Sequence, residues 1–385
     1  MFVQIADHLV HCVVEGPEEA PPLLLLHSIG TTQHIWDPQA MALARRFRVI
    51  RPDLRGHGLS GVTAGDYSMA LLAADALALL DALDIQCAHV AGCSIGGRVA
   101  LQLAALAPER VASLILVGTA LAYPDAATWQ TRIDAVRAQG TQVLADAVMP
   151  RWVAHPDTPG GLGLRAMLLR TDREGYAAAG AALRDASAGD LPERFAMPAT
   201  VILGEHDPAA PLAAAEAVRA RFAEAPLVVL PGASHIPNYE AAEALTAAML
   251  AHLDAQWQPP EDFLAAGYAV RKAVLGEAHV ARASLSVTPL DQPFQEYITR
   301  NVWGQIWTRP GLARHTRSLL TLAMMAALGR HEEFVLHVKA TRQTGVTPEE
   351  LSEVLLQVGA YAGVPLANHA LKLAKETYRL LDEAA

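Results

Sequence analysis

The feature that most constrains the fold is a regular alternation of short apolar runs with longer Ala/Leu-rich segments over the first 255 residues. The apolar runs have the length of strands, and the segments between them have the length of helices. Such alternation predicts a mostly parallel β-sheet covered by helices on both faces. The expected strands are Leu9–Glu15, Leu23–His27, Phe47–Pro52, Cys87–Gly92, Val111–Gly118, Ala199–Gly204 and Leu227–Leu230, and the expected helices are Met69–Leu83, Ile95–Ala107, Pro211–Phe222 and Tyr239–Leu253.

The alternation is interrupted twice, which divides the chain. Between about residues 119 and 191 helical segments occur without strand-like runs, so we expect an inserted helical cap. The polar, proline-containing stretch 256–262 predicts a linker between a domain at 1–255 and a second at 263–385. The second domain is expected to be all helical, with helices at Phe263–Val274, Phe294–Trp307, Thr316–Leu328, Glu332–Thr344, Pro348–Ala362 and Ala367–Leu381.

Composition limits the partners of the chain. Its 385 residues are 52% apolar and carry a net charge of −10, which favours a globular protein and disfavours nucleic acid or an anionic membrane as partner. An anionic ligand must then be held by local Arg, His or backbone N–H groups. No signal peptide is visible, and Cys12, Cys87 and Cys93 lack metal or redox spacing, so we expect a cytoplasmic protein with free thiols and without metal or cofactor.

Three residues in the first domain predict a catalytic triad. Ser94 lies in Gly92-Cys93-Ser94-Ile95-Gly96, between a strand and a helix, where a sharp turn projects a nucleophilic hydroxyl. Asp207 and His235 each follow a later strand, and the chain order Ser, acid, His matches this arrangement. The alternative is that both residues are structural, with Asp207 in a turn that caps a helix and His235 in a loop. In the triad, His235 accepts the Ser94 proton and Asp207 orients the imidazole.

An oxyanion hole is expected beside Ser94. Its first donor is the N–H of Ile95, and its second is that of Ile29 or Ser28 in the loop after an early strand. Two nearby histidines, His57 and His206, are interpreted as structural.

These segments resemble the α/β-hydrolase fold. Within it, His27-Ser28-Ile29-Gly30-Thr31-Thr32 with Trp36-Asp37-Pro38, together with the Ser94 motif, resembles the 3-oxoadipate enol-lactonases. The resemblance implies hydrolysis of a small anionic lactone that carries an acetate arm. Plain esterases and cofactor-free haloperoxidases share the same triad, so those activities remain alternatives.

The cap is expected to select the substrate. Trp129 and Arg132 are three residues apart on a predicted helix and share a face, so Arg132 could bind the acetate carboxylate beside Trp129. A packed Trp and a solvated Arg are the alternative, and Arg137, Arg151 and Trp152 are competing candidates.

The second domain carries a different set of polar residues. Glu333 and His337 are four apart on one helix, which suits proton transfer, a metal ligand or simply a solvated face. The segments Trp303–Leu312, Thr316–Leu319, Ala327–His337 and Val358–Pro365 resemble the 4-carboxymuconolactone decarboxylases. Some members of that wider helical family use a cysteine pair, which this domain lacks. The resemblance implies His337 as acid or oxyanion donor, Glu333 as its orienting group and Arg317 as a carboxylate ligand, with His315 and His331 as weaker alternatives.

The two resemblances imply successive reactions. Loss of carbon dioxide from 4-carboxymuconolactone leaves a dienolate, and its protonation gives the enol lactone that the first domain would open. We therefore expect a bifunctional enzyme of protocatechuate catabolism that forms homo-oligomers through the helical domain. The alternative is a serine hydrolase with a non-catalytic helical oligomerisation domain.

Overall fold

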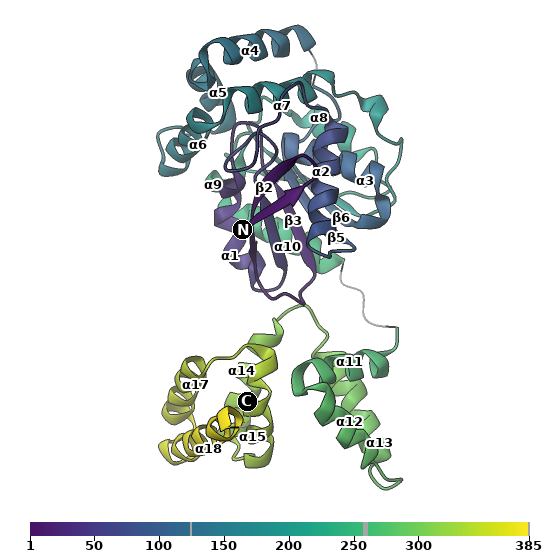
Figure 1. Ribbon diagram of the computed structural model, residues 1–385, viewed down its shortest axis with the longest axis vertical. Helices are drawn as coiled ribbons and strands as arrows, with labels where there is room; N and C mark the ends of the chain where they lie inside the picture. Colours follow the sequence, from purple (N-terminus) through teal and green to yellow (C-terminus); the bar gives the residue numbers. More distant parts are fainter. Residues whose placement is uncertain (124, 257–260, 384–385) are drawn as a thin grey trace. The chain divides into compact units, whose positions relative to one another are not determined.

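The computed structural model describes residues 1–123, 125–256 and 261–383 (Figure 1). The chain forms two compact units, Met1–Gln256 and Trp257–Ala385. Of the expected linker 256–262, positions 257–260 lie outside the described residues, and Asp262 caps the first helix of the second unit. Within the described residues, no helix combines the length and the apolar character needed to cross a membrane.

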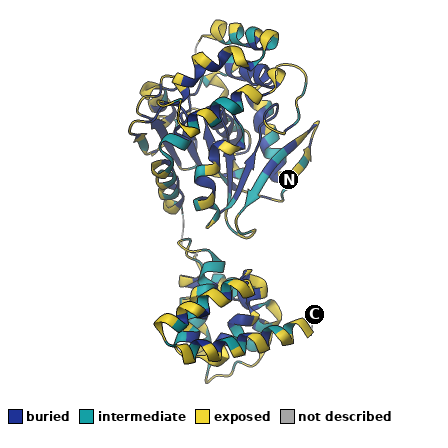
Figure 2. Ribbon diagram, turned by 90° about the vertical axis from the view of Figure 1, so that its left-hand side faces the viewer, coloured by how far each residue is buried: buried dark blue, intermediate teal, exposed yellow. Residues whose placement is uncertain are grey.

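The described residues of the first unit build an eight-stranded sheet in the order β1-β2-β4-β3-β5-β6-β7-β8. β1–β2 and β2–β4 pair antiparallel, and the remaining pairs are parallel. Continuous apolar runs such as Leu23–Leu26 are wholly buried, because helices cover both faces of a parallel sheet (Figure 2). The strands are β1 (Phe2–Ile5), β2 (His8–Glu15), β3 (Pro22–Leu26), β4 (Arg48–Pro52), β5 (Ala88–Cys93), β6 (Val111–Val117), β7 (Ala199–Gly204) and β8 (Leu227–Leu230).

Two pairs of helices pack together beside this sheet. α2 (Met69–Ala82) packs against α3 (Ile95–Leu106), and α1 (Asp37–Ala44) packs against α10 (Ala242–Ala255). α8 (Leu212–Arg219) follows β7. The helix expected at 239–253 is divided into α9 (Pro237–Glu240) and α10, because Ala241 leaves the helical conformation at φ −123° and ψ 42°.

A helical cap lies between β6 and β7, in the region expected from the sequence. It consists of α4 (Ala126–Gln139), α5 (Ala145–Trp152), α6 (Pro159–Arg170) and α7 (Arg173–Asp185), which Figure 1 shows together above the sheet. Arg98 on α3 joins both ends of this insertion to the body of the unit. Its guanidinium donates to the carbonyls of Leu121 (2.9 Å) and Ser187 (3.1 Å), so the cap is anchored one turn from Ser94.

The described residues of the second unit are helical. Thr347 caps α17 (Pro348–Tyr361) in a reciprocal capping box with Glu350. The helix expected at 294–307 changes at Thr299 to a π-helix, and that expected at 332–344 is divided at Ala340. The elements are α11 (Phe263–Leu275), α12 (Glu277–Leu285), α13 (Gln292–Ile298), the π-helix η5 (Thr299–Ile306), α14 (Arg314–Ala327), α15 (His331–Lys339), α16 (Thr341–Thr344), α17 (Pro348–Tyr361) and α18 (Val364–Glu383).

Candidate active sites

Ser94 occupies a strained turn between β5 and α3. Its φ of 56° and ψ of −117° lie in a region that non-glycine residues rarely adopt. The turn is possible because glycines flank it. A Cβ on Gly92 would lie 2.3 Å from the carbonyl carbon of Gly96, and a Cβ on Gly96 would lie 2.3 Å from the Leu26 oxygen. The glycines therefore allow the backbone to pack closely enough to present the Ser94 hydroxyl.

The structure brings the three triad candidates together. His235 Nε2 lies 2.9 Å from Ser94 Oγ, and His235 Nδ1 lies 2.9 Å from Asp207 Oδ2. The other Asp207 oxygen accepts the N–H groups of Ala209 (2.7 Å) and Ala210 (2.9 Å), which fix the carboxylate. All three triad side chains are buried. In this arrangement His235 can withdraw the hydroxyl proton while Asp207 holds the ring.

The loop after β3 lies beside Ser94 and offers the second oxyanion donor. Ile29 lines the same pocket as Ser94, and no hydrogen bond from its N–H is found among the described residues. The Gly30 N–H is already engaged, since it donates to His57 Nε2 at 3.0 Å. Ile95 begins α3, where an N–H has no partner within the helix. Ser28 does not line this pocket, so Ile29 is the better candidate for the second donor, beside Ile95.

His57 and His27 support that loop. His57 Nδ1 lies 3.1 Å from the Arg55 oxygen, and its other nitrogen accepts from Gly30. Burial lowers the pKa of His57 to about 3, so it is a neutral ring fixed by backbone groups. His27 bridges the Ser28 oxygen and the Leu54 N–H in the same way. His206 is exposed and lies 3.9 Å from Glu205.

A pocket of about 460 Å³ opens onto the triad between the sheet and the cap. Trp129 and Arg132 both line it, and the Arg132 guanidinium lies 4.6 Å from the centre of the Trp129 ring. Arg151 and Trp152 line it too. Arg137 does not: its guanidinium pairs with Asp66 and Glu174 outside the pocket. Among the described residues, no carboxylate forms an ion pair with Arg132 or Arg151, so both can take up an anion.

Tyr123 is a pocket residue that sequence reasoning missed. Its hydroxyl is buried and has no hydrogen-bond partner in the described part of the chain, and burial raises its pKa. It stands in a loop after β6 without a motif, so only its position after a strand end could have drawn attention to it.

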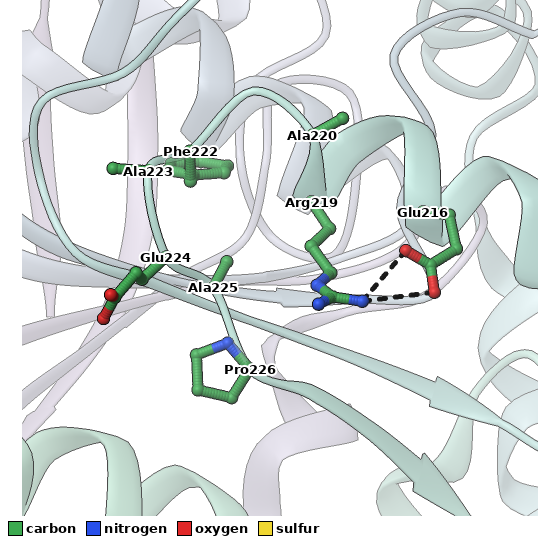
Figure 3. A pocket seen from close by; sticks show the side chains of 8 residues that line it. All are labelled: Glu216, Arg219, Ala220, Phe222, Ala223, Glu224, Ala225 and Pro226. Carbon is green, nitrogen blue, oxygen red and sulfur yellow. Dashed lines mark hydrogen bonds and ion pairs between the residues drawn. The ribbon is translucent and has the colours of Figure 1, made fainter.

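A second hollow, of about 610 Å³, lies around the end of α8 and the segment that leads into β8 (Figure 3). Arg219, its cationic residue, is paired with Glu216 on the same helix. No triad residue lines this hollow, and the charge of Arg219 is already paired, so the hollow does not have the chemistry of the Ser94 pocket.

In the second unit, His337 lies among aromatic side chains. Its ring is nearly parallel to those of Trp303 (6.3 Å, 16°) and Trp307 (6.4 Å, 19°), and all three residues are buried. Burial lowers the pKa of His337 to about 4, with Glu333 opposing that effect. His337 is therefore neutral near pH 7, and its Nδ1 is buried without a partner among the described residues. These properties suit a neutral hydrogen-bond donor better than an imidazolium acid.

The other sequence candidates in this unit are less closely grouped. Glu333 is exposed and acts on His337 through its charge, and no hydrogen bond joins the two within the described residues. Arg317 donates to the Arg309 oxygen at 2.8 Å, and its Nε is buried and unpartnered. His315 is bound to Glu350 (2.9 Å), and His331 packs on His369.

Trp303 and Trp307 belong to the segment that resembles the decarboxylases, but the sequence alone does not predict them as site residues. Two features of the sequence could have pointed to them. The two tryptophans are four residues apart, and His337 lies one helical turn after the apolar Phe334, which indicates that His337 faces a buried surface. Among the described residues, no group of three or more His, Cys, Asp or Glu side chains is placed to hold a metal.

Comparison with known proteins identifies both units. Residues 21–242 match the alpha/beta hydrolase fold family, and residues 292–376 match the carboxymuconolactone decarboxylase family. A 4-carboxymuconolactone decarboxylase of Acinetobacter baylyi is 46% identical over 113 residues, 29% of this chain and 84% of that protein. The 3-oxoadipate enol-lactonase 2 of the same organism is 34% identical over 242 residues, 61% of this chain and 89% of that protein. The crystal structure of the enol-lactonase from Burkholderia xenovorans LB400 is 35% identical with a TM-score of 0.64, and covers 66% of this chain and 99% of its own.

Proposed function

Because the chain belongs to the α/β-hydrolase fold family at residues 21–242 and to the carboxymuconolactone decarboxylase family at residues 292–376, we propose that it catalyses two successive reactions of protocatechuate catabolism. The second unit decarboxylates 4-carboxymuconolactone. The first unit hydrolyses the resulting 3-oxoadipate enol-lactone to 3-oxoadipate. The hydrogen-bonded chain from Ser94 through His235 to Asp207 is the observation that carries the hydrolytic half.

The hydrolysis follows from the geometry at Ser94. His235 takes the hydroxyl proton as Ser94 Oγ attacks the lactone carbonyl, and the developing oxyanion is bound by the N–H groups of Ile95 and Ile29. Collapse of the adduct breaks the ring C–O bond and releases the enol oxygen, which takes the proton from His235 and tautomerises to the ketone. Water activated by His235 then cleaves the ester to Ser94.

The cap supplies recognition of the acetate arm. Arg132 has no carboxylate partner among the described residues and faces the pocket, so it can bind the substrate carboxylate with the Trp129 ring against its guanidinium.

In the second unit, the reaction needs stabilisation of a dienolate and then protonation at carbon. His337 is neutral, and its ring N–H can donate to the lactone carbonyl as negative charge develops there, while a water molecule supplies the proton that the dienolate carbon takes up. Arg317 binds a substrate carboxylate, and the Glu333 charge partly opposes the lowering of the His337 pKa by burial. No step requires a metal or an organic cofactor.

The second unit also carries the proposed self-association of the chain in the cytoplasm. Its described surface exposes large apolar side chains that a lone helical unit would keep covered. The apolar residues of this unit with more than 60% of their surface exposed are Leu285, Leu290, Phe294, Tyr297, Leu328, Leu356, Tyr361 and Val364.

Product analysis of the intact protein given 4-carboxymuconolactone tests the proposal. The Ser94→Ala variant should still release carbon dioxide but accumulate the enol lactone, because only the nucleophile is lost. His206→Ala is the matched control, since His206 is exposed beside Asp207 and should leave 3-oxoadipate formation unchanged. Formation of 3-oxoadipate by Ser94→Ala at the normal rate would refute the role of Ser94, and absence of carbon dioxide release from the intact protein would refute the decarboxylase.

A further inference from the structure

Arg271 on α11 is a buried cation without an anion. The residue is 9% exposed, and its Nη1 donates to two neutral oxygens, Gln295 Oε1 and Thr299 Oγ1, each at 3.2 Å. Its Nε is buried and has no hydrogen-bond partner, and no carboxylate in the described part of the chain forms an ion pair with it. Burial lowers the pKa of Arg271, but a guanidinium remains charged in proteins.

The other buried arginines show that this is unusual for the molecule. Arg51 pairs with Glu15 and Asp37, and Arg55 pairs with Asp7 and Asp75. Arg98, which is wholly buried, lies 3.6 Å from Asp190. An unpaired charge removed from water is strongly destabilising, so buried charges are paired or bind a charged ligand.

The position of Arg271 connects it with His337. Val274 and Leu275, one turn further along α11, pack in the same buried cluster as Trp303 and Trp307, whose rings face His337. Thr299, which accepts from Arg271, lies one turn before Trp303 on η5. η5 is a π-helix, a conformation that is rare and frequent at functional sites.

We propose that Arg271 binds a carboxylate of the lactone acid that is decarboxylated in this unit, an inference that rests on the proposed function. The substrate carries two carboxylates, one lost and one retained. A guanidinium closely paired with the departing carboxylate would stabilise the ground state and oppose its loss, so the buried Arg271 binds the retained acetate arm. The departing carboxylate contacts only the half-buried Arg317, where water weakens the pairing. Arg271 thereby fixes the lactone ring against Trp303 and His337.

A substrate–variant cycle on the full-length chain tests this. Arg271→Met keeps the length of the side chain and removes its charge, and the substrates are the lactone diacid and its analogue with a methyl ester on the acetate arm. For the diacid, kcat/KM for carbon dioxide release should fall at least about 30-fold. For the ester, wild type and Arg271→Met should be equal within about twofold, because the ester offers Arg271 no anion. Arg282→Met, an exposed arginine on α12, is the matched control and should change neither value.

Stability and mass distinguish the alternatives. Removing an unpaired buried charge should leave the resistance of the second unit to denaturant unchanged or raised, so unfolding of its helices in Arg271→Met overturns the inference. An equal loss of kcat/KM with both substrates also overturns it. So does a lower oligomer mass of Arg271→Met by light scattering, because Arg271 would then pair with a carboxylate of a second copy of the chain. If wild type and Arg271→Met release carbon dioxide equally well, the role of Arg271 is refuted and the proposed function stands. If wild type releases no carbon dioxide, the proposed function is refuted and this inference with it.

Discussion

Replacing Arg132 by methionine removes one of the two arginine cations that line the Ser94 pocket while keeping an unbranched side chain against Trp129. A hydrogen bond to a charged group contributes about 1.5–3 kcal/mol, and each 1.4 kcal/mol is a factor of ten. The enol lactone should therefore lose roughly 10- to 150-fold in kcat/KM. Because Arg132 is only half-buried, we expect a value near the lower end of that range.

The assay compares the enol lactone with a neutral aryl ester such as 4-nitrophenyl acetate, which has no carboxylate for Arg132. Hydrolysis of the ester should change less than threefold or so, since the triad and the oxyanion donors are untouched. Arg137→Met is the matched control on the same helix, because Arg137 pairs with Asp66 and Glu174 outside the pocket. Equal losses with both substrates, or an unchanged value for the lactone, would refute the assignment and direct attention to Arg151.

Two further predictions concern His337 and the turn at Ser94. Burial lowers the pKa of His337 to about 4, so its neutral form is complete above about pH 5.5, and the decarboxylation rate at saturating substrate should be flat up to pH 8 and decline only as the pH falls towards 4. A rate that instead decreases as the pH rises through 6 to 7 would show that an imidazolium is the acid. A Cβ on Gly97 would lie 1.8 Å from Thr119 Oγ1, so Gly97→Ala should destabilise the first unit by about 1–3 kcal/mol in denaturant titration and impair lactone hydrolysis, while decarboxylation continues. Adding Thr119→Ala should recover part of that loss; no recovery would mean that the Gly92 oxygen or the Thr119 Cβ, each 2.9 Å away, sets the limit.

The parts of the fold that the sequence predicted are those set by burial along the chain. Ala199–Gly204 is buried at every position, so its apolar run could only be a central strand. The convergence of Ser94, Asp207 and His235 was predictable for a related reason: parallel strands end at one edge of the sheet, so residues that follow β5, β7 and β8 meet even when they are far apart in sequence.

The missed elements are those whose form depends on neighbours. β1 is a four-residue edge strand whose Phe2 is exposed, so it shows no buried pattern. η5 forms a π-helix where α11 presses against it: a Cβ on Gly267 would lie 2.1 Å from the Thr299 oxygen, and one on Gly304 would lie 2.0 Å from the Phe263 oxygen. The two helices therefore approach each other closely at these glycines. This is a tertiary contact, and a local sequence pattern does not encode it.

The acidity of the chain explains which arginines are available to an anion. With 40 acidic residues against 30 basic ones, many arginines pair with a carboxylate, and a paired guanidinium has little attraction left for a ligand. Arg132 faces a pocket, and Arg271 is packed against η5, and neither has an acidic partner among the described residues. Under the proposed assignments, recognition of an anionic lactone by this acidic chain depends on leaving such cations unpaired. An unpaired guanidinium is unfavourable when it is removed from water. Partial exposure to solvent reduces that free energy for Arg132, and hydrogen bonds to neutral oxygens reduce it for Arg271.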